Sequence, residues 1–67
     1  MRDKVLSIEH LGYLVKILQN SESQLYSWQV YNDNLLVFDS LILGEVTTIS
    51  LAVDWVKIFI QDLRRNG

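Results

Sequence analysis

The chain contains no cysteine and no proline, and it has only three glycines and one histidine. Without cysteine it can form neither a disulfide framework nor a zinc site with sulfur ligands. The glycines are isolated at positions 12, 44 and 67, so a glycine-rich phosphate-binding loop is excluded. His10 lacks further metal ligands at helical spacing, and no nucleophile motif accompanies the serines. We therefore expect no metal, no cofactor and no enzymatic activity.

Positive charge and long apolar runs are also scarce. Six basic residues stand against eight acidic ones, and none of the six falls within residues 24–43. Nucleic-acid-binding proteins usually carry a basic patch, so nucleic acid is not an expected partner. The most apolar segment, residues 46–60, contains Asp54 and Lys57, which excludes a membrane span. Glu9 interrupts the apolar N-terminal stretch, so no signal peptide is indicated, and we expect a cytoplasmic protein.

Apolar side chains are abundant, because 49% of the residues are hydrophobic. This composition excludes disorder and predicts one small domain that spans residues 1–67. Within residues 7–20 the apolar side chains recur at the spacing of a helix face, and Ser7 is a candidate N-cap. The pattern predicts a first helix over this range. Its apolar positions are Ile8, Leu11, Leu14, Val15 and Leu18.

The middle of the chain is typical of a β-hairpin. Residues 24–31 are rich in aromatic side chains and alternate, and the apolar segment 35–43 follows a turn at residues 32–34. The second of these strands is apolar on both faces, so both faces need cover. Asp39 interrupts this apolar strand. Its side chain is interpreted as a functional carboxylate, as a charge that protects a sheet edge from pairing, or as a group with structural partners. The last two interpretations are favoured.

A second helix is predicted over residues 46–65. Its polar side chains recur at steps of three and four, which marks one solvated stripe along a helix. The stripe comprises Thr47, Ser50, Asp54, Lys57, Gln61 and Arg64. Thr47 or Thr48 can cap the first turn. Strand-forming residues leave an alternative in which residues 46–52 form a third strand and the helix begins at Asp54.

Together these elements predict an α+β fold, a helix-strand-strand-helix domain with a β-hairpin. Ordering such a chain requires on the order of 4,000 Å² of buried apolar surface, more than we expect this monomer to bury. The apolar excess therefore predicts a homo-oligomer, most simply a two-fold dimer. Helix packing is favoured slightly over pairing of hairpin edges, because Asp39 would blunt a strand edge. The candidate interface residues are Trp55, Phe59, Val56, Leu63, Leu35 and Val37.

Two functions fit this composition. The first is a small, non-enzymatic, homo-oligomeric interaction module that binds another protein, such as a regulator, an inhibitor or an immunity-type protein. The alternative is a dimer that binds a small molecule in an aromatic-lined cleft at the subunit interface. The candidate ligand contacts are Tyr26, Trp28 and Tyr31.

The solvated stripe generates a first prediction. Gln61→Glu is expected to change the free energy of unfolding by less than about 0.5 kcal/mol, because the side chain meets only water. Urea denaturation of the variant and the wild type measures this difference. A loss of 2 kcal/mol or more would contradict the placement of the stripe.

Overall fold

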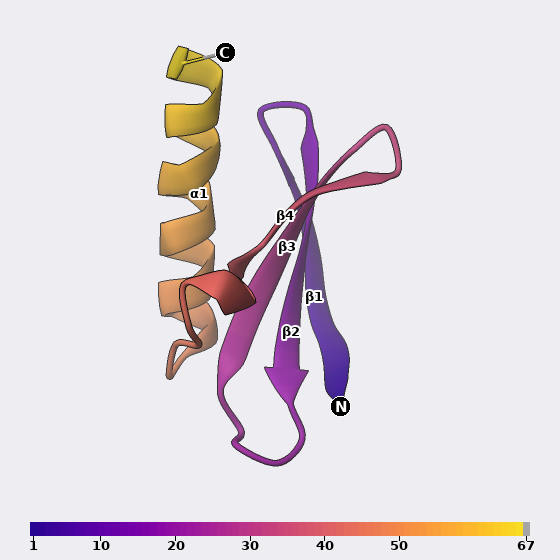
Figure 1. The fold of residues 1–67 in the computed structure, drawn as a ribbon, viewed down its shortest axis with the longest axis vertical. Helices are drawn as coiled ribbons and strands as arrows, with labels where there is room; N and C mark the ends of the chain where they lie inside the picture. The colour runs from indigo at the N-terminus through magenta and orange to yellow at the C-terminus, as the bar shows by residue number, and fades with distance from the viewer. Residues whose placement is uncertain (67) are drawn as a thin grey trace.

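The computed structural model describes residues 1–66 and shows a four-stranded sheet with one helix against one of its faces (Figure 1). The sheet is antiparallel, and the strands lie in the order in which they occur in the chain. The first and last strands are therefore the two edges. The elements are β1 (Arg2–His10), β2 (Tyr13–Asn20), β3 (Tyr26–Asn32), β4 (Leu35–Asp39), the 3-10 helix η1 (Ser40–Ile42) and α1 (Ile49–Asn66).

The predicted first helix, residues 7–20, is wrong, because this segment belongs to β1 and β2. Leu11 and Gly12 form a two-residue turn in which both φ angles are positive, 52° and 88°. This geometry matches the twist of an antiparallel pair and turns the chain back on itself. Val15 faces the helix, whereas its neighbour Leu14 lies on the opposite face. Because apolar residues lie on both faces of the strand, their spacing in the sequence resembles that of a helix face.

The predicted hairpin is confirmed, but its second strand is shorter than expected. β3 and β4 pair in antiparallel fashion around Asp33 and Asn34, which adopt positive φ angles of 51° and 68°. β4 ends at Asp39, whose carboxylate accepts a hydrogen bond from the Leu41 N–H at 3.1 Å. That bond caps η1, so residues 40–43 leave the sheet instead of extending the strand.

The predicted second helix is confirmed as α1, which begins at Ile49 and not at residue 46, and the alternative third strand over residues 46–52 is wrong. Thr48 caps the helix, because its Oγ1 accepts a hydrogen bond from the Leu51 N–H at 3.1 Å. Val46 alone forms a β-bridge, with Tyr26. All six residues of the polar stripe are exposed, as expected. α1 is not long and apolar enough to cross a membrane, and the same holds for every helix within residues 1–66.

The core lies between α1 and the central strands β2 and β3. Side chains from alternate positions of these strands meet a row of helix residues spaced four apart. The fully or almost fully buried members are Val15, Ile17, Trp28, Val30, Ala52, Val56 and Ile60. The fold class is therefore α+β, but the expected helix-strand-strand-helix order is wrong, since two strands replace the first helix.

The accessible surface does not support the expectation that one chain cannot bury enough apolar area. It measures 4469 Å². A compact monomer of this mass is expected to expose roughly 4,400 Å². The position of the exposed apolar side chains is therefore more informative than their total.

The Leu11–Gly12 turn generates a second prediction. A leucine at φ 52° is strained, whereas asparagine tolerates this region, so Leu11→Asn is expected to stabilise the protein by about 1 kcal/mol. Leu36→Asn is the matched control, because Leu36 is also exposed but lies within β4. Thermal and urea unfolding measure both variants. Equal destabilisation by the two changes would contradict the strain at Leu11.

Candidate functional site

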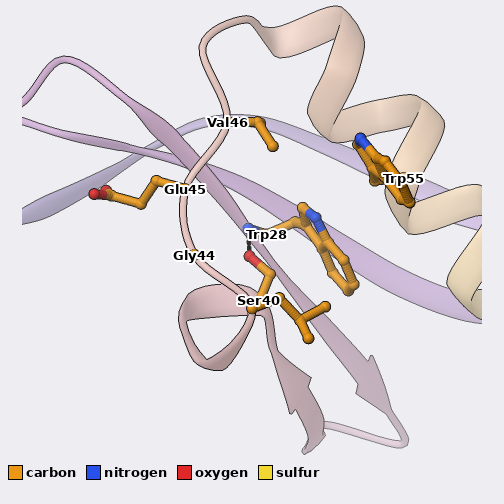
Figure 2. Close-up of a pocket in the computed structure, with 7 residues that line it drawn as sticks. Trp28, Ser40, Gly44, Glu45, Val46 and Trp55 are labelled. Atoms are coloured by element: carbon orange, nitrogen blue, oxygen red, sulfur yellow. Dashed lines mark hydrogen bonds between the residues drawn. The ribbon is translucent and has the colours of Figure 1, made fainter.

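A groove runs between α1 and the segment of residues 43–46 (Figure 2). Its main hollow has a volume of about 370 Å³, with Trp28 at the base and Trp55 on the helix side. A smaller hollow of about 180 Å³ continues along α1 past Ile58 and Phe59 to Asp62. We call the two together the groove. The main hollow is lined by Trp28, Ser40, Leu43, Gly44, Glu45, Val46 and Trp55.

Aromatic packing fixes the base of the groove. The Trp28 ring lies 5.4 Å from Phe38 and 5.3 Å from Phe59, measured between ring centroids. Phe38 and Phe59 stack on each other at 4.4 Å. Trp28 is only 4% exposed, whereas Trp55 across the groove is 54% exposed. The groove therefore has a rigid apolar base and an apolar wall that is open to solvent.

The wall opposite α1 is held by hydrogen bonds to β3. The Ser40 hydroxyl accepts a hydrogen bond from the backbone N–H of Trp28 at 2.8 Å. Val46 and Tyr26 exchange two backbone bonds of 2.7 and 2.8 Å. Between these anchors Gly44 has a φ angle of 104°, which a side chain rarely tolerates. Both ends of the wall are thus fixed on the strand that carries Trp28.

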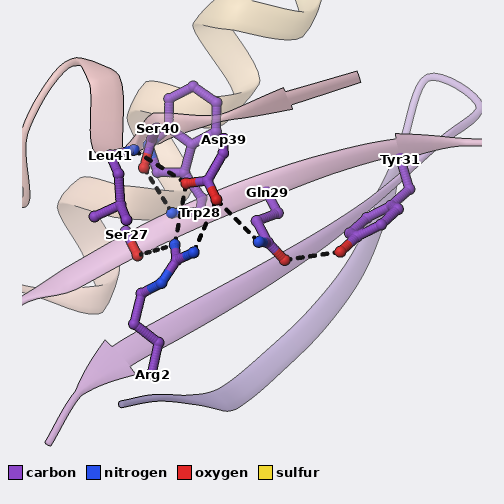
Figure 3. Close-up of polar contacts among 8 residues, drawn as sticks. All are labelled: Arg2, Ser27, Trp28, Gln29, Tyr31, Asp39, Ser40 and Leu41. Carbon is purple, nitrogen blue, oxygen red and sulfur yellow. Dashed lines mark hydrogen bonds and ion pairs between the residues drawn. The ribbon is translucent and has the colours of Figure 1, made fainter. Parts of the chain in front are cut away.

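A polar network covers the sheet face opposite α1 (Figure 3). Arg2 donates two hydrogen bonds to the Asp39 carboxylate, at 3.0 and 2.8 Å, and a third to the Ser27 hydroxyl at 3.2 Å. Gln29 donates another bond to Asp39 at 3.0 Å, and its own oxygen accepts one from the Tyr31 hydroxyl. Because Arg2 lies on β1 and Asp39 on β4, this ion pair connects the two edges of a curled sheet.

Charge stabilises this network. The hydrogen bonds from Arg2, together with those from Gln29 and the Leu41 N–H, lower the pKa of Asp39 to about 2 despite partial burial. The bond to Asp39 in turn raises the pKa of Arg2. The Asp39 carboxylate therefore has structural partners. It does not line the groove, and it does not point away from the sheet as a charge that protects an edge.

The structure brings together only some of the predicted interface residues. Trp55 and Phe59 border the groove. Val56 is fully buried against the sheet of its own chain, and Leu63 is half-buried. The remaining two candidates, Leu35 and Val37, are exposed on β4 but do not line the groove.

The three aromatic residues of the alternative ligand site also separate. Trp28 lies at the base of the groove, and Tyr26 packs beside the core. Tyr31 lies on the opposite face of the sheet, where the Lys16 ammonium sits 4.6 Å from its ring centroid. A cleft made of all three residues therefore does not form within one chain.

Sequence reasoning missed the residues that complete the groove, above all Leu43 and Ile58. Leu43 was expected within the second strand, and Ile58 was not among the candidate interface residues. Gly44 was the available signal, since a lone glycine after an apolar run indicates a turn that can bring that run beside another element. Which element it meets depends on the tertiary fold.

The chemistry of the groove is mainly apolar contact. Within residues 1–66, no group of three acidic, histidine or cysteine side chains lies close enough to hold a metal ion. His10 lies on β1, outside the groove, with its Nε2 atom buried and without a hydrogen-bond partner in the described part of the chain. Of the polar residues at the main hollow, Ser40 is hydrogen-bonded to the backbone N–H of Trp28, and the carboxylate of Glu45 points away from Trp28 and Trp55 (Figure 2). The groove therefore presents mainly apolar surface.

Comparison with known proteins gives no further guide to the site. No family model matches the chain, and no similar curated protein or solved structure was found. The interpretation of the groove therefore depends on its geometry and composition alone.

The Arg2–Asp39 pair generates a third prediction. The pKa of Asp39 is lower in the folded state, about 2, than its ordinary value of 3.8. The pair therefore stabilises the fold above about pH 4, and this stabilisation is lost as the pH falls toward 2. Asp39→Asn is expected to destabilise the protein at pH 7 and to flatten the acid dependence of its stability. Urea unfolding between pH 2 and pH 7 measures this.

Asp33→Asn is the matched control, because Asp33 is exposed in the β3–β4 turn. It should retain the acid dependence of the wild type. An acid dependence in Asp39→Asn as steep as in this control would contradict the assignment.

Proposed function

We propose that the protein is a small, non-enzymatic interaction module that assembles with a second copy of itself and acts by binding another protein, as a regulator, an inhibitor or an immunity-type protein does. The observation that carries this proposal is the exposed apolar surface along the groove. There Leu43, Trp55 and Ile58 are 71%, 54% and 51% exposed.

These three side chains lie close together, above buried aromatic residues. All three line the smaller hollow, and Trp28 and Phe59 lie beneath them. A large apolar patch that remains exposed on a folded chain commonly marks an interface with another protein. Tryptophan in particular is enriched among the residues that dominate binding energy. The buried aromatic base means that the surface needs little rearrangement before it binds.

A second candidate function is the binding of a small molecule at the same interface. It is favoured by the volume of the main hollow, about 370 Å³, which falls within the range of about 300–1,000 Å³ typical of ligand sites. The aromatic contacts would then come from Trp28 and Trp55, since Tyr31 lies on the other face of the sheet.

Assembly generates a fourth prediction. If the folded chain associates, its melting temperature should rise with protein concentration over a hundredfold range. Sedimentation in the same range should give a mass that is a multiple of 7.8 kDa. A constant melting temperature with a folded species of 7.8 kDa would refute self-assembly.

Native mass spectrometry separates the two candidate functions. A retained small molecule adds its own mass to the oligomer, whereas an interaction module shows whole multiples of the chain mass. The spectrum should be recorded on protein purified without a denaturing step.

A further inference from the structure

α1 carries an exposed apolar row beside its polar stripe. Leu51, Trp55 and Ile58 recur at intervals of four and three residues, which places them on one side of the helix. That side borders the groove, since Trp55 and Ile58 line it together with Leu43. The polar stripe lies on a different side, and its residues are also exposed. α1 therefore has two solvent-facing sides, and one of them is apolar from Leu51 to Ile58 and ends at Asp62.

The exposed apolar area approaches what a small dimer needs. Leu43, Leu51, Trp55 and Ile58 are between 41% and 71% exposed. This corresponds to on the order of 400 Å² per chain. A standard homodimer interface buries about 800 Å² per partner, of which about 65% is apolar, so it requires roughly 500 Å². One copy of the same surface would therefore be sufficient to cover it.

The dipoles of two packed α1 helices favour an antiparallel arrangement. Antiparallel pairing opposes the two dipoles, whereas parallel pairing would align them. A two-fold axis perpendicular to the helices produces the antiparallel arrangement.

The edge strand β4 is less suited to pairing. β4 is an edge strand with exposed Leu35, Leu36 and Val37. It is only five residues long, and its register with β3 shifts between Phe38 and Leu36, which leaves Val37 as a bulge. Short strands and bulges are features that prevent pairing between sheet edges.

We infer that a second copy of this chain docks on the groove through antiparallel pairing of the two α1 helices. The axis passes between Trp55 and Ile58, the centre of the apolar row, so Trp55 of each chain packs against the Ile58 of the other and enters the other groove. This inference rests on the self-assembly proposed above and names the surface that performs it.

The absence of cysteine permits a direct test on the full chain. Single variants Ile58→Cys, Gln61→Cys and Leu35→Cys are treated with a short bifunctional thiol crosslinker, at a concentration where sedimentation shows the oligomer. Ile58→Cys should give a covalent dimer. Gln61→Cys, on the polar stripe, and Leu35→Cys, on β4, are matched exposed controls and should remain uncrosslinked.

A second measurement uses Trp55, which lies at the centre of the proposed interface. Trp55→Ala should weaken the dimer at least about 30-fold in sedimentation, as expected of a central interface tryptophan. Leu35→Ala should leave the dissociation constant unchanged. Circular dichroism verifies that both variants fold. If Trp55→Ala does not fold, Ile58→Lys, which places a charge on the same row, replaces it.

The outcomes separate the two proposals. Crosslinking through Leu35→Cys but not Ile58→Cys would overturn the helix interface while self-assembly stands. An unchanged dissociation constant in both Trp55→Ala and Ile58→Lys would overturn it as well. A monomer at every concentration would refute self-assembly itself, and a small molecule retained in the groove of a monomer would assign the groove to a ligand instead.

Discussion

A single helix is too narrow to cover four strands. A helix is about 10 Å wide, whereas strands in a sheet lie about 4.8 Å apart, so α1 can shield only about two of them. It lies over β2 and β3, where Val15, Ile17, Trp28 and Val30 are buried. The two edge strands and the segment after β4 remain beside the helix. The groove arises from this mismatch, because residues 43–46 run next to α1 without filling the space against Trp55.

The Arg2–Asp39 ion pair connects the sheet to the groove. Arg2 reaches from one edge strand to the other, and the carboxylate that it binds also caps η1. η1 leads directly into residues 43–46, and Ser40 is hydrogen-bonded to the backbone of Trp28. The polar face and the apolar groove on opposite sides of the sheet are thus connected through a few residues. A substitution of Asp39 is therefore expected to alter the groove wall, although Asp39 itself does not line the groove.

The distribution of apolar surface, not its amount, favours an interaction function. The chain exposes the area expected of a compact monomer of its mass. Leu51, Trp55 and Ile58 of α1 nevertheless lie together on one side of the helix, next to Leu43 and above a buried aromatic cluster. A charged side chain at any of these positions would remove the patch at little cost in stability, since the positions are exposed. Their apolar character is therefore consistent with a partner that covers them.

Local chemistry in the sequence was sufficient to predict the hairpin turn, the helix over most of residues 46–65 and its solvated stripe. Asn and Asp favour positive φ angles, and the period of Lys57, Gln61 and Arg64 is incompatible with a strand. The sequence could not separate helix from strand at residues 7–20, because apolar residues on both faces satisfy both periods. Only the tertiary structure decided that question, since pairing with β3 places Val15 and Ile17 in the core. The groove and the Arg2–Asp39 pair likewise required the fold, because they join residues far apart in the chain, and only packing determines which of these meet.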